Sequence, residues 1–396
     1  MAAGLPTPIH GRCEPGFAAV RDAFAENFAL RRDVGAALCV YIGGRPVVDL
    51  WGGWADAART RPWTPDTIAS CASTSKGLTS VCAHRLVERG LIDLDAPVAR
   101  YWPEFAQAGK GAIPVRWLMC HRAGLPAIRH DMPQESLYDW DAFCAALAAE
   151  TPWWEPGTQH GYHATTFGYL IGEVARRAGG KTIGQIAASE VCGPLGADFY
   201  IGVPQSEDAR AAEILTEPPL PTGEESLIRR AAREPGSLAE RVFGNPARDP
   251  ARMNFRRWRA AEIPASNGHA SARGVARLYA ALANGGELDG IRVLERDSIE
   301  RATEEHSFGR DAVIGLTTRF ALGFALRQPG AGAGIQKVVP NPRAFGHTGR
   351  GGSIGFADRE ARIGFGYVMN QYIAATPQHP DLRWQSLATA LYRALG

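Results

Sequence analysis

The sequence is poor in lysine and contains no long apolar run. Lysine occurs at only four positions, Lys76, Lys110, Lys181 and Lys337, while arginine supplies almost all the positive charge. No apolar stretch approaches the roughly 18–20 residues of a membrane span. The opening MAAGLPTPIHGRCEPG lacks the cationic start and apolar core of a secretory signal. We therefore predict a cytoplasmic protein without a membrane partner, in which each lysine is more informative than usual.

Patterns typical of disulfides, metal sites and nucleic-acid binding are also missing. The seven cysteines are odd in number and include no C-x-x-C pair, which fits neither a disulfide framework nor a zinc site. The ten histidines include no H-E-x-x-H. The net charge is +2, and no basic stretch is interleaved with aromatic residues. We predict no metal, no cofactor and no nucleic-acid partner, and the sequence leaves the oligomeric state open.

The hydrophobic pattern predicts strands near both ends of the chain and helices between them. Residues 16–28 and 271–286 have apolar residues at helical spacing, as do the C-terminal residues 382–395. Two β-rich runs meet at Gly43-Gly44, which indicates a hairpin. Further β-type runs occupy residues 319–326, 343–357 and 362–372. Because hairpins join antiparallel strands, the expected fold class is α/β (α+β), with a mainly antiparallel sheet that is flanked by helices and formed from both termini.

The middle of the chain predicts an inserted, mostly helical domain. We assign residues 1–88 and 270–396 to the sheet domain and residues 89–269 to the insertion. Residues 203–265 are rich in Pro, Arg and Glu and have weak periodicity, so they are expected to form long loops and short helices that could cover a site.

CASTSKGLTS, from Cys71 to Ser80, contains the pattern S-x-x-K at Ser73 and Lys76. Side chains three residues apart lie on one face of a helix, and the pattern LTSVCAHRLVERGLI that follows Lys76 predicts a helix beginning here. Small and apolar neighbours favour desolvation of the lysine, which would let it act as the base that activates the serine. None of the other three lysines has a serine three residues before it.

Ser353 is the rival nucleophile, in the G-x-S-x-G of Gly351-Gly352-Ser353-Ile354-Gly355. A nucleophile elbow needs a strand, a sharp turn and then a helix. Residues 354–370 instead alternate and turn like a β-hairpin. We therefore prefer Ser73.

Two distant segments could complete a site around Ser73. Tyr162 precedes an amphipathic helix, and a phenol close to a lysine can exchange protons with it as a coupled pair. His347-Thr348-Gly349 precedes a glycine-rich strand whose edge could bind substrate. The N–H of Arg350 would then pair with the N–H of Ser73 as an oxyanion hole.

These three motifs resemble those of serine β-lactamases and penicillin-binding proteins. Ser73-Thr74-Ser75-Lys76, Tyr162-His163-Ala164 and His347-Thr348-Gly349 occur in the family's order, and WLMCHRAGLPA is similar to its L-x-x-H-x-S-G-L segment. The resemblance covers roughly residues 16–395 and is greatest to class C β-lactamases and family VIII carboxylesterases. It implies a serine β-lactamase-like fold, with Ser73, Lys76 and Tyr162 catalytic and with His163, His347, Thr348 and Gly349 binding substrate.

Two departures from the family pattern bear on the substrate. Ala164 replaces an asparagine that would bind an acylamino side chain, and His347 replaces a lysine that would bind the carboxylate of a β-lactam. Arg350 could compensate for the second change. We therefore predict a metal-free serine carboxylesterase that cleaves short-chain esters through an acyl-enzyme on Ser73.

Three alternatives remain open at this point. A β-lactamase or D-Ala-D-Ala peptidase would use the same nucleophile, and weak action on β-lactams is compatible with the preferred interpretation. An acyltransferase would pass the acyl group to an alcohol or amine other than water. A catalytically inactive binding module is the third, although the complete set of proton-handling residues argues against it.

Overall fold

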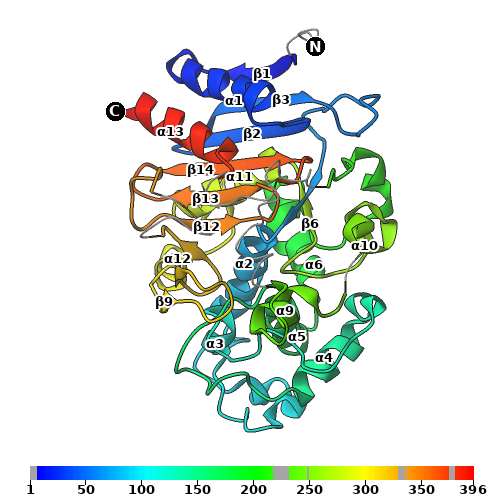
Figure 1. Cartoon of the computed structure of the whole chain (residues 1–396). Helices are drawn as coiled ribbons and strands as arrows, with labels where there is room; N and C mark the ends of the chain where they lie inside the picture. The colour runs from blue at the N-terminus through cyan, green and yellow to red at the C-terminus, as the bar shows by residue number, and fades with distance from the viewer. Residues whose placement is uncertain (1–6, 217–231, 248, 329–334, 336, 374–379) are drawn as a thin grey trace.

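The protein is built on a nine-stranded sheet to which both ends of the chain contribute (Figure 1). The computed structural model describes residues 7–216, 232–247, 249–328, 335, 337–373 and 380–396. The strand order is β1-β3-β2-β14-β13-β12-β11-β10-β9, and every neighbouring pair is antiparallel. The strands are β1 (Ile9–Cys13), β2 (Gly35–Ile42), β3 (Arg45–Gly53), β9 (Ser307–Arg310), β10 (Thr317–Phe320), β11 (Ala325–Leu326), β12 (Phe345–Thr348), β13 (Ile354–Asp358) and β14 (Ile363–Met369). The predicted fold class is confirmed.

The pairing of β2 with β14 joins the two ends of the chain. Its register runs from Ile363 opposite Ile42 to Met369 opposite Ala36. On the other side of β2, Gly43 and Gly44 form the hairpin turn to β3 with φ of 57° and 81°, the left-handed conformations that a tight two-residue turn requires. The glycine pair therefore sets the hairpin that the sequence predicts.

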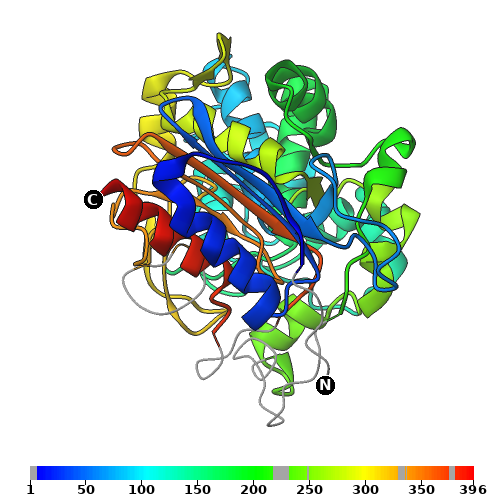
Figure 2. The ribbon, with the colours of Figure 1, turned by 90° about the horizontal axis from the view of Figure 1, so that it is seen from above.

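Helices cover both faces of the sheet (Figure 2). The terminal helices α1 (Ala18–Leu30) and α13 (Arg383–Leu395) pack side by side on one face, and α11 (Ala272–Ala283) packs on β2, β13 and β14 from the other. A Cβ atom on Gly364 would lie 2.2 Å from the backbone nitrogen of Ala280. Glycine in β14 thus lets α11 approach the sheet closely.

Several of the remaining elements, among them α2, α3, α4, α5 and α9, are drawn in the lower half of Figure 1. A separate small sheet has the order β4-β6-β5. The remaining elements are β4 (Ala69–Ala72), α2 (Ser75–Glu88), α3 (Val115–Met119), α4 (Trp140–Ala149), α5 (Thr166–Gly179), α6 (Ile183–Ile186), α7 (Gly193–Leu195), β5 (Phe199–Tyr200), α9 (Leu238–Gly244), α10 (Arg256–Ala260), β6 (Gly268–Ala270), β7 (Glu287–Leu288), β8 (Ile291–Arg292) and α12 (Arg296–Ala302).

The predicted excursion over residues 203–265 contains only short helices in its described part, among them α9 and α10. Residues 217–231 and residue 248, which belong to the same prediction, lie outside the described residues. The division of the chain into residues 1–88 with 270–396 and an insertion at 89–269 stays a prediction.

Candidate active site

Ser73 lies in the turn between β4 and α2. The preceding residue, Ala72, has φ of 45°, a left-handed conformation that non-glycine residues rarely adopt and that is typical of constrained functional turns. The Lys76 N–H donates to the Ser73 carbonyl at 3.0 Å. Ser73 lies two positions before the first residue of α2. The hydrogen bond to the Lys76 N–H nevertheless places Ser73 and Lys76 one helical turn apart, as in a regular helix.

The Lys76 side chain is completely buried and points at Ser73. Its Nζ lies 3.3 Å from Ser73 Oγ, 2.7 Å from the Ala164 carbonyl oxygen and 3.0 Å from the Ala265 carbonyl oxygen. The lysine is therefore held by backbone atoms of two separate segments, and its amine also contacts the serine hydroxyl.

Tyr162 brings its ring under the same lysine. Lys76 Nζ lies 4.7 Å from the centre of the Tyr162 ring, and the ring stacks on Phe320 with centroids 6.0 Å apart. Burial raises the pKa of the Tyr162 phenol well above its ordinary value, and a hydrogen bond with the Ser73 side chain partly lowers it. The structure thus brings the three predicted residues Ser73, Lys76 and Tyr162 together.

Asp311 fixes the tyrosine loop from the sheet side, in the connection between β9 and β10. Its Oδ1 accepts hydrogen bonds from the backbone N–H groups of Tyr162 at 3.1 Å, Val313 at 2.8 Å and Ile314 at 2.9 Å. The side chain is 1% exposed. The sequence analysis missed this residue, because an isolated aspartate 149 positions from its partner leaves no signal in a single sequence.

His163 is buried behind the tyrosine rather than turned toward an open pocket. Its Nε2 accepts from the Leu125 N–H at 3.0 Å, and its Nδ1 donates to the Gly161 carbonyl at 2.6 Å. The residue is 0% exposed, and burial lowers its pKa to about 3. Both ring nitrogens of His163 are thus occupied by backbone groups, which differs from the substrate contact that the sequence analysis expected.

The predicted strand edge at β12 lies against the turn that contains Ser73. A Cβ atom on Gly349 would lie 2.2 Å from the Cys71 carbonyl oxygen and 2.9 Å from Thr74 Oγ1. Only glycine permits this approach, which places the neighbouring Arg350 beside the Ser73 turn. Thr348, the last residue of β12, is partly exposed.

His347 is a neutral imidazole at this edge. Its Nδ1 donates to the Thr348 carbonyl at 2.7 Å, so Nε2 carries the lone pair. Burial and then the charge of Lys76 lower the pKa of His347 to about 3. The buried Nε2 has no hydrogen-bond partner among the described residues. His347 therefore offers an acceptor, and no positive charge, to the site.

Ser353 binds the backbone of the Ser73 turn. Its Oγ donates to the Cys71 carbonyl at 2.9 Å and lies 3.1 Å from Thr74 Oγ1. The residue is 1% exposed and leads directly into strand β13. The strand-turn-helix context of a nucleophile elbow is therefore missing here, as the sequence pattern predicts.

An apolar cluster separate from the main core surrounds the tyrosine loop. Ala164 and Tyr162 pack with residues of α9 and with nearby apolar residues: Ala127, Trp153, Leu238, Val242, Phe243 and Val313. The helix α9 belongs to the excursion over residues 203–265. Part of that segment thus lies against the motif residues.

The described ranges contain no cluster of three or more His, Cys, Asp or Glu side chains that could hold a metal ion. No helix in the same ranges is long and apolar enough to cross a membrane. Two surface hollows of about 630 and 360 Å³ lie around Arg296 and Arg362 and include none of the motif residues.

Comparison with known proteins agrees with the motifs. The sequence matches the Beta-lactamase family over residues 20–389. It is 39% identical over 375 residues to "Esterase/beta-lactamase LipL" of Mycobacterium tuberculosis, covering 92% of this chain and 84% of that protein.

Two crystal structures share the complete fold. One is a family VIII carboxylesterase, with 45% identity and a TM-score of 0.87 over 98% of this chain and 100% of that chain. The other is a penicillin-binding protein homologue from Caulobacter crescentus, with 38% identity and a TM-score of 0.86 over 98% and 100%. The chain therefore belongs to the beta-lactamase family.

Proposed function

We propose that the protein is a serine carboxylesterase that works through an acyl-enzyme on Ser73. The observation that carries the proposal is the position of the Ser73 hydroxyl, 3.3 Å from Lys76 Nζ and near enough to the Tyr162 phenol to lower its pKa. A serine is a poor nucleophile until a base removes its proton. Here the buried Lys76 and the partly buried Tyr162 both lie near that one hydroxyl.

The proton steps involve Lys76 and Tyr162 as a pair. A neutral amine with a neutral phenol holds the same number of protons as an ammonium with a phenolate, so the two states titrate together. In either state the pair can take the proton of Ser73 while Oγ forms a bond to the ester carbonyl carbon. The pair then returns this proton to the alkoxide as the C–O bond breaks, and a water molecule repeats the sequence to release the acid.

The N–H groups of Ser73 and Arg350 are proposed to hold the negative oxygen of the tetrahedral intermediate. The close contact of Gly349 with the Cys71 carbonyl supports this role, because it brings the Arg350 backbone next to the nucleophile turn. Two such donors aimed at the developing charge lower the barrier by several kcal/mol, about 3 for each donor.

A neutral ester fits this site better than a β-lactam. A β-lactam antibiotic carries a carboxylate, and the family lysine that would bind it is replaced by His347, whose pKa of about 3 leaves it uncharged at neutral pH. Ala164 contributes its carbonyl to Lys76 and has no side-chain amide to bind an acylamino group. The apolar cluster with α9 favours a small, covered acyl pocket and therefore short-chain esters.

A second function, β-lactam hydrolysis, is favoured by the relative named as both esterase and β-lactamase. We expect it to be the slower activity, for the two reasons just given. Acyl transfer to an alcohol would proceed from the same acyl-enzyme and would appear as a transester product when alcohols are added.

The test is a substrate panel with matched variants. p-Nitrophenyl acetate, butyrate and decanoate are compared with nitrocefin, for the wild-type protein and for Ser73→Ala. We expect turnover to be greatest for the short esters, lower for decanoate and lowest for nitrocefin, and to disappear in Ser73→Ala. Nitrocefin turnover above ester turnover would replace the esterase with a β-lactamase, and an unreactive wild-type protein would indicate a binding module.

A further inference from the structure

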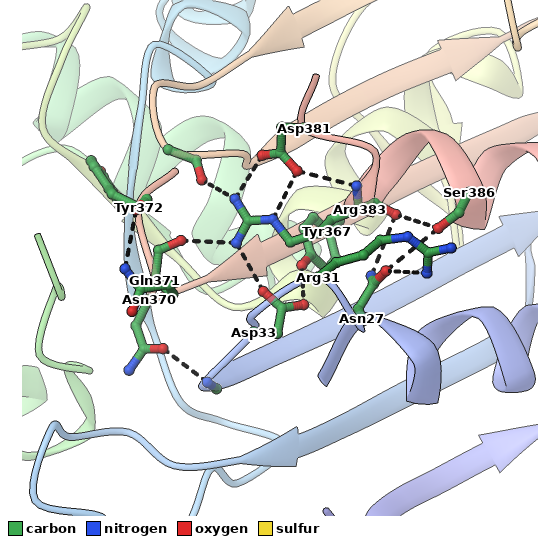
Figure 3. A network of polar contacts seen from close by, with 12 residues as sticks. Asn27, Arg31, Asp33, Tyr367, Asn370, Gln371, Tyr372, Asp381, Arg383 and Ser386 are labelled. Carbon is green, nitrogen blue, oxygen red and sulfur yellow. Dashed lines mark hydrogen bonds and ion pairs between the residues drawn. The ribbon is translucent and has the colours of Figure 1, made fainter. Parts of the chain in front are cut away.

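The buried guanidinium of Arg383 contacts the loop that carries the proposed oxyanion donor (Figure 3). Arg383 is the first residue of α13, on the sheet face opposite α11, and is 0% exposed. Its Nη2 donates to the carbonyl oxygen of Gly351. Gly351 directly follows Arg350 in the connection between β12 and β13. A C-terminal helix thus reaches the back of the active-site loop.

All five N–H groups of the guanidinium have an acceptor. Besides Gly351, Nη1 donates to Asp33 Oδ1 at 2.9 Å and to the Gln371 carbonyl at 2.8 Å. Asp381 accepts from Nε at 2.9 Å and from Nη2 at 2.6 Å. Tyr367 donates its hydroxyl to the second oxygen of Asp33. Arginine supplies five donors in a planar fork, so this set of acceptors fixes the plane and rotation of the side chain.

The loop packs closely against this anchor. Gly351 has φ of 93°, and a Cβ atom there would lie 2.4 Å from the Tyr372 ring. Gly352 has φ of 124°, and its Cβ would lie 2.3 Å from Arg383 Nη2. On the opposite side, Gly349 touches the Cys71 carbonyl. The loop is therefore clamped between the nucleophile turn and the Arg383 cluster.

The same cluster also reaches the nucleophile strand. Gln371, which accepts from Arg383, is followed by Tyr372, whose hydroxyl donates to the Ser70 carbonyl at 3.2 Å. Ser70 lies in β4, three residues before Ser73. Arg383 and its hydrogen-bond partners therefore contact the backbone of both segments that carry the proposed oxyanion donors.

A gain in folding stability is a weak explanation for a buried Arg383–Asp33–Asp381 cluster. Replacing a buried ion pair by well-packed apolar residues is often neutral or stabilising, because removing charges from water costs about as much as their attraction returns. What apolar side chains cannot supply is a fixed direction for a backbone carbonyl. We propose that Arg383 is a positioning residue for the oxyanion hole, which it orients through Gly351. This inference rests on the proposed function.

The experiment compares Arg383→Lys with Arg273→Lys. Arg273 is the matched control, since it forms an ion pair with Asp49 at 2.7 Å at a half-exposed site on α11. Active sites are counted with a fluorophosphonate, so that kcat refers only to molecules with a reactive Ser73. Each protein is assayed with an ester and with its thionoester, in which sulfur replaces the carbonyl oxygen and weakens the interaction with an oxyanion hole.

We expect Arg383→Lys to lower kcat per titrated site about 10- to 100-fold, the scale of a disturbed oxyanion donor, with KM changed less than about threefold. The ester-to-thionoester ratio of kcat/KM should fall, because the variant no longer favours oxygen as strongly. Methylguanidinium added to Arg383→Ala should restore part of the rate. Arg273→Lys should match the wild-type protein in every readout.

A purely structural role predicts a different pattern. In that case the number of titratable sites falls, while the remaining sites keep the wild-type kcat and the wild-type ratio, and this result would overturn the proposal. Should Arg383→Lys not fold, Asp381→Asn keeps the other acceptors and is expected to lower kcat and the ratio in the same direction. An unchanged ratio in folded Asp381→Asn would equally refute it. Absence of ester turnover in the wild-type protein would instead refute the esterase, and the positioning role with it.

Discussion

The choice between the two serines can be tested by removing each hydroxyl in turn. Ser73→Ala removes an atom that contacts both Lys76 and Tyr162, so we expect esterase activity to fall on the order of 10⁴-fold or more. Ser353→Ala removes a buried hydroxyl that supports the turn without facing these groups. We expect this variant to keep its activity within about tenfold.

The two variants should also differ in stability. Ser353 Oγ is buried, and its loss removes the hydrogen bond it shares with the buried Thr74 Oγ1, while the Cys71 carbonyl keeps its bond from the Thr74 N–H. An unpaired buried polar group costs about 1–3 kcal/mol, and the free energy of unfolding in urea should fall by this amount. Ser73 is partly exposed, so Ser73→Ala should change the unfolding free energy by less than about 1 kcal/mol.

The assay combines p-nitrophenyl acetate hydrolysis, urea unfolding and mass spectrometry of fluorophosphonate-labelled peptides. The label should appear on the peptide that contains Ser73 in the wild-type protein and in Ser353→Ala. A label on Ser353, or full ester turnover in a folded Ser73→Ala variant, would refute the reasoning from the S-x-x-K geometry.

Three further predictions concern pH, stability and packing. Because the pKa of His347 is about 3, the pH profiles of kcat/KM for the wild-type protein and His347→Asn should have the same shape between pH 5 and 8. An inflection near pH 6.5 that is present in the wild-type protein and absent from His347→Asn would contradict this. Burial raises the pKa of Glu173, but hydrogen bonds from two arginines and Trp140 outweigh this effect and lower the pKa to about 2. The contribution of Glu173 to stability is therefore present above about pH 4.5 and lost toward pH 2. Glu173→Gln should lower the unfolding free energy at pH 7 by about 3 kcal/mol but much less at pH 2. Gly349→Ala should reduce kcat at least about 100-fold by displacing the loop from the Cys71 carbonyl, whereas Gly16→Ala, where a Cβ atom would meet no neighbour within 4 Å, should have no effect on kcat.

Features that depend on short spacing could be predicted from the sequence. The Ser73–Lys76 contact follows from a three-residue offset, and the Gly43-Gly44 hairpin follows from two residues that tolerate positive φ. The strand after Ser353 was predicted from alternation alone. In each case the physical cause acts within a few residues, so one sequence contains enough information.

Features that depend on distant pairing could not be predicted. Asp311 binds the N–H of Tyr162 from 149 positions away, and Arg383 binds Asp33 from 350 positions away. A buried aspartate or arginine runs against the composition of protein interiors, and nothing in the local sequence marks it. His163 shows the converse, since its place in a motif suggested substrate contact while its ring nitrogens bind backbone groups.

The position of Lys76 makes it a structural link in addition to its proposed role in proton transfer. Its amine joins the tyrosine loop, through the Ala164 carbonyl, to the segment before β6, through the Ala265 carbonyl. Removing the amine would therefore release two buried acceptors together with the base, and the resulting loss of activity would mix both effects. Tyr162 separates them more cleanly, because a phenylalanine would keep the ring under Lys76 and against Phe320 while removing only the phenol oxygen. The chemistry of the pair is thus best measured through the tyrosine, whose backbone is held independently by Asp311.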